Sequence, residues 1–130
     1  MLSSFPISPA LAASDLERAR AFYEEVLGFK PHFEYPEGVF YTSGEVSFEV
    51  YQSQFAGTNQ ATAAGWHVDD LDREVTELRE RGVKFEEYDF GEFKTVEGIL
   101  TAPDGIRAAW FKDPEGNILG LFQPGEMAES

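Results

Sequence analysis

The chain repeats itself, and this repetition limits the possible folds more than any other feature. The segment SDLERARAFYEEVLGFK, residues 14–30, parallels DDLDREVTELRERGVKF, residues 69–85. Each segment follows a short apolar stretch and precedes strand-forming sequence; in the second half the turn signals PDG and DPEGN separate these strands. The repeat therefore predicts two strand–helix–strand–strand–strand (βαβββ) modules.

Each predicted helix is delimited by its own sequence signals. Ser14 followed by Glu17 is typical of a capping box at the start of the first helix. Asp69 or Asp70 caps the second helix, and a glycine ends each of them. Apolar residues recur at helical spacing in between, so each helix has one face that packs against a sheet.

The length of 130 residues predicts a single α+β domain. We expect module one at about residues 5–53, a polar linker at about 54–61, and module two at about 62–124. Neither module can bury its sheet alone. The two are therefore expected to form an open, curved, eight-stranded mixed sheet around a cavity.

The charge balance excludes two classes of partner. Twenty-four Asp and Glu against ten Lys and Arg give a net charge of −14. This charge repels nucleic-acid phosphates and anionic membranes, so we expect neither partner. It attracts a cationic ligand by electrostatic steering, and it equally serves solubility.

Other composition features narrow the chemistry. The chain has no Cys, which excludes thiolate chemistry and suits a cytoplasmic location. The N-terminal sequence MLSSFPISPALAAS predicts neither a signal peptide nor a membrane span. A glycine-rich phosphate loop, an HExxH motif and a serine-nucleophile motif are all absent from the sequence.

Two motifs in order resemble a known family. SDLERARAFYEEVLGF resembles the first-helix signature of the vicinal oxygen chelate superfamily, which includes glyoxalase I, bleomycin-resistance proteins and extradiol dioxygenases. FKDPEGNILGLFQ resembles the last hairpin of that superfamily, and the likeness spans about Ile7 to Gln123. The resemblance implies the fold described above and a homodimer. It leaves function open, because the superfamily hosts metal enzymes and metal-free binding proteins alike.

The resemblance also implies where a metal would be held. Counting from the motifs, the four ligand positions of metal-using members fall on Ser8, Glu49, Ala63 and Gly120. Glu49 alone is a good donor for a divalent metal, so we expect neither a metal nor another cofactor. His67 does not replace Ala63, because four strand residues span roughly 13 Å.

Two ionisable residues, Glu49 and His67, have alternative interpretations. Glu49 is either a solvated carboxylate at a cavity mouth, or an acceptor or counter-ion for a ligand. His67 either makes a local hydrogen bond at the end of its strand or takes part in ligand binding or acid–base chemistry. His32 is expected on an outer strand.

The predicted cavity combines a small-residue floor with aromatic walls. Small side chains leave the floor open at Ala10, Ala12, Ala63, Gly65 and Gly120. The residues predicted to bind a ligand are Glu49, Tyr51, His67, Phe90, Phe93, Trp110 and Phe122. The segment FEEYDFGEFKT, residues 85–95, interleaves acids with aromatics and suits an organic cation over the cavity or, equally, a soluble edge strand.

These features favour a metal-independent protein that binds a small molecule and sequesters a cationic or aromatic organic compound. One alternative is a divalent-metal-dependent lyase, isomerase or dioxygenase with a displaced site around Glu49 and His67. Another is a metal-free lyase or isomerase with Glu49 as its general base.

Overall fold

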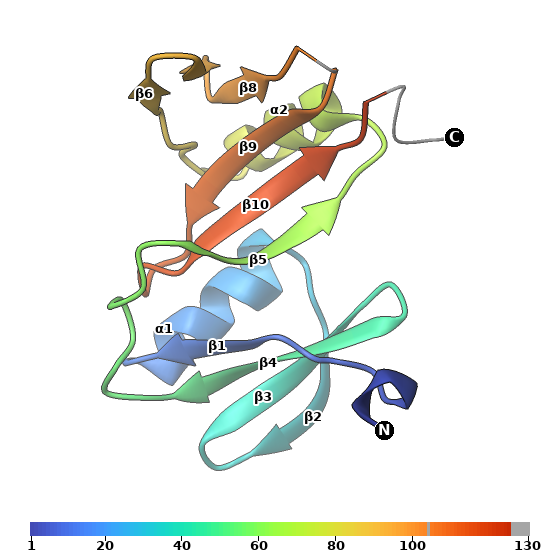
Figure 1. Ribbon diagram of the computed structural model, residues 1–130. Coiled ribbons are helices and arrows are strands. Elements are labelled where there is room, and N and C mark those ends of the chain that lie inside the picture. The colour runs from blue at the N-terminus through green and yellow to red at the C-terminus, as the bar shows by residue number, and fades with distance from the viewer. Residues whose placement is uncertain (104, 126–130) are drawn as a thin grey trace. The chain divides into compact units, whose positions relative to one another are not determined.

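The computed structural model describes residues 1–103 and 105–125, and the chain divides into two compact units (Figure 1). The first unit comprises Met1–Asn59 together with Pro114–Asn117. The second comprises Gln60–Asp113 and the chain from Ile118 onward.

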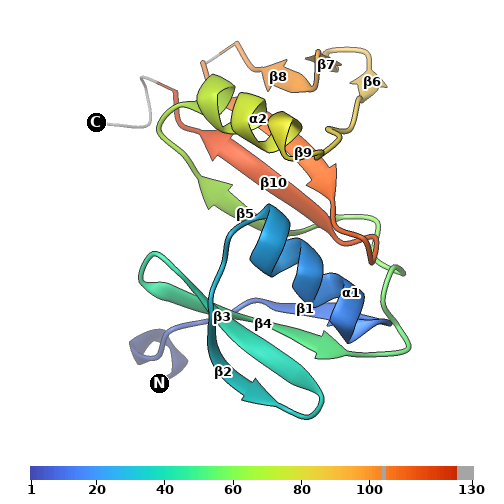
Figure 2. The same ribbon diagram turned by 180° about the vertical axis from the view of Figure 1, so that it is seen from behind.

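The first unit is a four-stranded sheet with one helix. Its elements are η1 (Leu2–Ser4), β1 (Ala10–Ala13), α1 (Leu16–Ala21), the π-helical turn η2 (Phe22–Val26), β2 (Pro31–Tyr35), β3 (Gly38–Ser43) and β4 (Val46–Gln52). The strand order is β1-β4-β3-β2, with β1 parallel to β4 and the other pairs antiparallel. The helix covers one face of this sheet, as Figure 2 shows.

The second unit repeats this plan with additional short strands. Its elements are β5 (Thr62–His67), α2 (Leu71–Glu80), β6 (Asp89–Phe90), β7 (Phe93–Val96), β8 (Ile99–Thr101), β9 (Arg107–Lys112) and β10 (Ile118–Gln123). The strand order is β5-β10-β9-β8-β7-β6, and β5 runs parallel to β10. In each unit, therefore, the strand before the helix pairs in parallel with the last strand of the module.

The α+β class and the paired modules are confirmed, but the strand count is wrong. The described residues form two mixed sheets of four and six strands, where one sheet of eight was expected. The difference arises after α2. There Phe85 makes only an isolated bridge to Phe111, and residues 89–96 then fold into a tight hairpin, β6–β7.

The helix starts correct one prediction and resolve another. Asp15 caps α1 by accepting a hydrogen bond from the Arg18 amide, so the predicted Ser14 capping box is wrong. Asp70, not Asp69, caps α2 through the Arg73 amide. The Ser14 hydroxyl instead donates to the Glu115 carboxylate at 2.7 Å.

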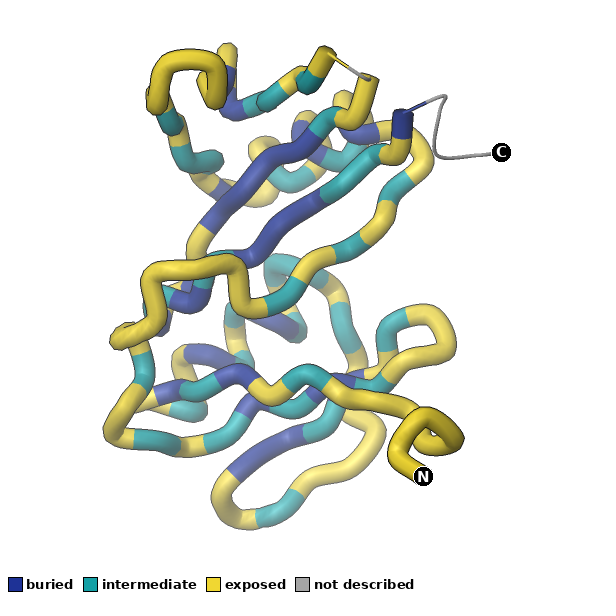
Figure 3. The backbone as a smooth tube through the Cα atoms, in the orientation of Figure 1, coloured by how far each residue is buried: buried dark blue, intermediate teal, exposed yellow. Residues whose placement is uncertain are grey.

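Each unit has its own core between helix and sheet (Figure 3). The largest fully buried side chains of the first unit are Tyr23, Tyr41, Val39 and Val50, and those of the second are Phe111, Leu71, Leu119 and Val75. These residues recur at every second strand position or on one helix face. The opposite face of each sheet is therefore not covered by the helix of its unit. Among the described residues, no helix is long and apolar enough to cross a membrane.

The turn between β9 and β10 belongs to the first unit, although both strands belong to the second. The Glu115 side chain, 1% exposed, accepts hydrogen bonds from the Ser14 amide and hydroxyl, the Asp15 amide and the Arg18 guanidinium at 2.6–3.1 Å. Asn117 donates from Nδ2 to the Ala12 carbonyl. Glu115 therefore anchors this turn at the start of α1.

Candidate functional site

An aromatic pocket of about 280 Å³ lies on the helix-free face of the second unit. Its lining residues come from the β6–β7 hairpin and its approach, from β9, and from the chain around β5 and β10: Gln60, Ala61, Thr62, Tyr88, Phe90, Phe93, Trp110 and Ile118. Trp110 is 9% exposed and forms the base, whereas Phe90 is 73% exposed and lies at the rim. We call this cavity the aromatic pocket.

The rings of the aromatic pocket contact one another in preferred geometries. Phe93 lies 5.6 Å from Trp110 at 40°, and Tyr88 meets Trp110 edge-on at 5.7 Å. Phe90 completes the group at 6.0 Å from Phe93 and 6.1 Å from Tyr88. Centroid separations of this size are those of attractive aromatic pairs, so the rings support one another while keeping faces open to a ligand.

Local sequence explains how the β6–β7 hairpin presents these rings. Gly91 adopts a positive φ of 80°, which a tight turn between Phe90 and Phe93 requires. The buried Thr95 ties the hairpin to the preceding segment, because its hydroxyl accepts from the Tyr88 amide at 2.8 Å and its amide donates to the Tyr88 carbonyl at 2.9 Å. The same hydroxyl donates to Glu87 at 2.6 Å.

Phe122 extends the aromatic surface across the sheet. Strand pairing places Gly65, Gly120 and Trp110 in one row of this face, and His67, Phe122 and Ala108 in the next. The Phe122 ring meets Trp110 edge-on at 6.1 Å and lies 6.1 Å from the His67 ring. Both glycines lie under Phe122. A Cβ atom would come within 2.4 Å of its ring at Gly65 and within 2.7 Å at Gly120.

The expectation of an open floor at these two glycines is therefore wrong. Gly65 and Gly120 accommodate the Phe122 ring, which occupies the space that their side chains would take. Trp66 projects to the opposite face, as strand alternation predicts, and stacks on the buried Phe111 at 6.3 Å and 7°.

Acidic residues alternate along the chain with the aromatic residues of the pocket. Asp89 pairs in register with Lys94 on the hairpin, and Glu92 is exposed in its turn. Glu86 forms an ion pair with Lys112 at 3.4 Å. Burial, together with the negative charge of Glu86, raises the pKa of the Tyr88 phenol.

The candidate residues of the first unit form a separate polar site. Glu49 on β4 accepts a hydrogen bond from the Tyr35 hydroxyl, and the Tyr35 ring packs over Gly38, whose Cβ would meet it at 2.7 Å. This hydrogen bond, with some desolvation and the nearby negative charge, raises the pKa of Tyr35 to about 12. Tyr51 follows on the same face, opposite Gly38. Tyr35 thus holds the Glu49 carboxylate in a defined position.

The structure brings together part of the predicted site. Phe90, Phe93 and Trp110 line the aromatic pocket, Phe122 contacts Trp110, and His67 contacts Phe122. Glu49 and Tyr51 belong to the first unit. His32 lies exposed on β2, an edge strand.

The sequence-based prediction of the site does not include two residues that the structure places there. Tyr88 lies two positions from Phe90, so strand alternation could have included it. Tyr35 had no comparable signal, because its contact with Glu49 depends on the β2–β3 hairpin folding over Gly38.

The positions implied for a metal do not fit one. The Ser8 hydroxyl donates to the Ser47 carbonyl at 2.5 Å, and Ala63 lies where the β5–β10 register shifts. At Gly120, Phe122 fills the space of a donor side chain. Within residues 1–103 and 105–125, no three His, Asp or Glu side chains gather in a way that could hold a metal ion.

Solved structures of this fold cover nearly the whole chain. A lactoylglutathione lyase from Agrobacterium tumefaciens matches with a TM-score of 0.71 and 21% identity, covering 92% of this chain and 93% of the other. A glyoxalase family protein from Enterococcus faecalis gives 0.73 and 20%, covering 94% and 99%. A fosfomycin resistance protein from Mesorhizobium loti gives 0.66 and 15%, covering 95% of each chain. At these identities the likeness concerns the fold alone.

No curated protein sequence matches the chain. A family model does match, over residues 7–121, and its extent agrees with the two motifs and the paired modules described above. This match shows that the chain belongs to the Glyoxalase/Bleomycin resistance protein/Dioxygenase superfamily.

Proposed function

We propose that this protein binds a small, planar, cationic organic compound in the aromatic pocket without a metal ion. The observation that carries this proposal is the convergence of Tyr88, Phe90, Phe93 and Trp110 around one cavity of about 280 Å³. A volume of this size suits one or two fused rings, and aromatic walls select flat, polarisable compounds.

The charge around the pocket supports a cationic ligand. A cation over an aromatic face is stabilised by the ring quadrupole, and Trp provides the strongest such face. Glu92 lies in the turn of the hairpin that carries Phe90 and Phe93, and Glu86 acts electrostatically on the Tyr88 phenol. The net charge of −14 adds long-range attraction for a cation.

Metal independence is supported by the packing of Phe122. A carboxylate at position 120 would displace its ring, and positions 8 and 63 offer a serine hydroxyl and a methyl group. Elemental analysis of protein purified without chelators tests this part of the proposal. Stoichiometric iron, manganese, nickel or zinc would contradict it.

A matched ligand series tests the binding function. Calorimetric titration with N-methylquinolinium, quinoline and quinoline-2-carboxylate separates the effect of charge from that of the ring system. We expect affinity to fall in that order, with the anion at least about tenfold weaker than the cation. Equal affinities, or no binding by any member, would contradict the proposal.

Tryptophan substitutions locate the binding. Trp110→Leu should weaken N-methylquinolinium binding about tenfold, because the buried stacking face is lost. Trp66→Phe is the matched control, since Trp66 stacks on Phe111 on the other sheet face. In that control the remaining Trp110 fluorescence should still be quenched by ligand.

A second candidate function rests on the Tyr35–Glu49 hydrogen bond. A carboxylate held by a phenol is a suitable general base for a metal-free lyase or isomerase. Turnover of lactoylglutathione, the compound in the name of the Agrobacterium relative, tests it in the presence of a chelator. The activity should be lost in Glu49→Gln; unchanged activity in this variant would exclude Glu49 as the base.

We further propose a homodimer and a cytoplasmic location. The family resemblance supports the first, and the absence of cysteine supports the second. Light scattering of the purified chain measures its mass in solution, and a monomer at micromolar concentration would contradict the dimer.

A further inference from the structure

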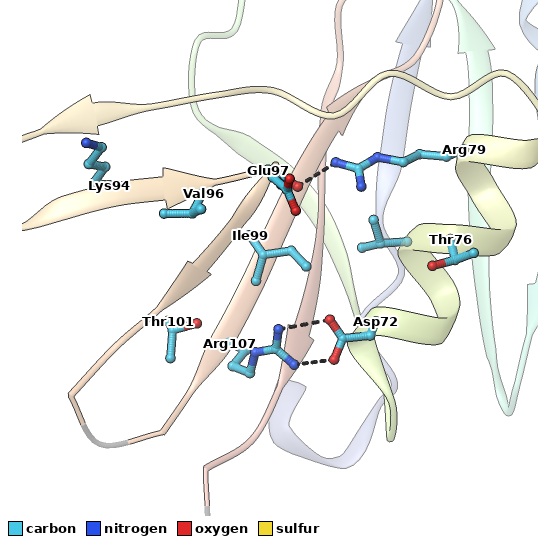
Figure 4. Close-up of a pocket in the computed structure, with 10 residues that line it drawn as sticks. Asp72, Thr76, Arg79, Lys94, Val96, Glu97, Ile99, Thr101 and Arg107 are labelled. Carbon is cyan, nitrogen blue, oxygen red and sulfur yellow. Dashed lines mark hydrogen bonds and ion pairs between the residues drawn. The ribbon is translucent and has the colours of Figure 1, made fainter.

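We propose a second binding site in the second unit, independent of the aromatic pocket: the cleft between α2 and the β7–β8 hairpin binds a small organic monocarboxylate. The cleft encloses about 480 Å³ (Figure 4). Its lining comes from α2, β7, β8, the turn between those strands and the start of β9: Asp72, Val75, Thr76, Arg79, Lys94, Val96, Glu97, Ile99, Thr101 and Arg107. We call it the helix cleft.

Cationic side chains gather in the helix cleft against the trend of the whole molecule. Only ten residues of the chain are Lys or Arg, and three of them, Arg79, Lys94 and Arg107, line this cleft. In a protein of net charge −14, such a grouping of cations in one lining offers donors for an anionic group.

Arg79 is positioned to receive an anion. Its Nη2 donates to the Glu97 carbonyl at 2.5 Å, and its guanidinium carbon lies 5.5 Å from the centroid of the Phe85 ring. These contacts fix the guanidinium between helix and hairpin, and Figure 4 shows the one with Glu97. They use one of its five N–H donors. A fixed guanidinium with free donors matches the planar fork of a carboxylate.

The acidic residues of the helix cleft limit the negative charge that a ligand can carry. Arg107 donates to both Asp72 oxygens, at 2.7 and 3.0 Å, and neutralises that carboxylate. Glu97 is the remaining acid in the lining. Outside the lining, Glu87 interacts electrostatically with Arg79 and Asp70 with Arg107, so the cleft has no surplus of positive charge. A single carboxylate facing the free donors of Arg79 therefore suits the cleft better than a phosphate dianion.

The remaining lining residues define the body of the ligand. Val75, Val96 and Ile99 supply apolar surface between the two arginines, and Thr76 and Thr101 add hydroxyl groups. A compound with a compact hydrocarbon body and one carboxylate can therefore contact both the apolar residues and the Arg79 guanidinium. Arg107 and Trp110 are three residues apart in β9 and project to opposite sheet faces, so this site is separate from the aromatic pocket.

Nuclear magnetic resonance on the full ¹⁵N-labelled chain tests the site, with cyclohexanecarboxylate as the probe. Saturable shifts should appear at Thr76, Arg79, Val96 and Ile99. The neutral cyclohexanecarboxamide should bind at least about tenfold more weakly, because a charge-assisted pair is lost. Shifts confined to the aromatic pocket, or equal binding by acid and amide, would overturn the proposal.

Variants separate the site from general electrostatics. Arg79→Gln should weaken the probe about tenfold, whereas Arg73→Gln, an exposed residue of α2 outside the cleft, should leave binding unchanged. Equal loss in both variants would overturn the proposal. If Arg79→Gln does not fold, Thr76→Phe provides the second test: it fills the cleft from an exposed helix position and should abolish the shifts, and undiminished binding would overturn the site.

Discussion

At the scale of single residues, the Phe122 ring and the two glycines beneath it form one packing unit. Gly65 and Gly120 adopt ordinary backbone conformations, so space and not φ requires glycine at these positions. The position that the family resemblance marks for a metal-binding carboxylate has instead become part of an aromatic surface.

Substitution at Gly120 should reveal this packing. We expect Gly120→Ala to cost about 1–3 kcal/mol of the free energy of unfolding, because its Cβ would lie 2.7 Å from the Phe122 ring. In Phe122→Ala the same substitution should cost much less. Urea denaturation of the two single variants and the double variant measures this coupling, and additive costs would contradict the described contact.

The Tyr35–Glu49 hydrogen bond should be visible in a titration. The Glu49 carboxylate accepts from the neutral phenol and holds the Tyr35 pKa at about 12, above the ordinary tyrosine value of 10.0. Glu49→Gln should lower this pKa toward the ordinary value, as followed by nuclear magnetic resonance of the tyrosine ring. Because the folded pKa is raised, the stabilisation is complete below pH 10 and is lost as pH rises toward 12. An unchanged Tyr35 pKa in the variant would exclude the hydrogen bond.

At the scale of elements, the turn between β9 and β10 stabilises the start of α1 through hydrogen bonds to Glu115. Four donors on Ser14, Asp15 and Arg18 converge on the Glu115 carboxylate. Burial alone would raise the pKa of this carboxyl, but these hydrogen bonds outweigh burial and lower it to about 2. The carboxylate also lies at the positive end of the helix.

Acid should therefore weaken the first unit through Glu115. Its folded pKa of about 2 lies below the ordinary glutamate value of 4.5, so its stabilisation is present above pH 4.5 and lost as pH falls toward 2. The difference corresponds to at most about 3 kcal/mol. Glu115→Gln should lower stability at pH 7 and reduce the loss between pH 4.5 and 2, measured by urea denaturation at each pH.

The exposed Glu45 in the β3–β4 turn supplies the control. Glu45→Gln should leave both stability at pH 7 and the acid-side slope unchanged. If the two variants behave alike, the role assigned to Glu115 is wrong.

At the scale of the whole molecule, the sequence predicted the repeat, the helices and the α+β class, because helical spacing and terminating glycines are local signals. It grouped Phe90, Phe93 and Trp110 at one cavity because aromatic residues are abundant in the second module and interleave with acids in residues 85–95. It could not predict the Glu115 contact with Ser14, which spans 101 residues of chain. Nor could it predict that the Phe122 ring folds back over Gly120, because side-chain direction depends on neighbouring strands.

The net charge of the molecule makes its stability depend on salt. At −14, self-repulsion opposes the folded state, and added salt screens it. Raising potassium chloride from 10 mM to 500 mM should stabilise the protein by about 1 kcal/mol, or roughly 4 °C in Tm. Reversing the exposed Glu17, Glu45 and Glu80 to Lys should reduce this dependence, and a fall in Tm with salt would contradict it.

The turn that carries Glu115 makes the two copies of the repeat unequal in their ability to fold alone. A chain cut in the segment between the two copies would leave the first copy without the four residues that complete its own helix start, since those residues are encoded in the second copy. We expect the first half alone to have a lower free energy of unfolding than the first unit has in the full chain. The two separately expressed halves should associate when they are mixed. The first copy of the repeat therefore depends on the second copy for the residues that complete its helix start.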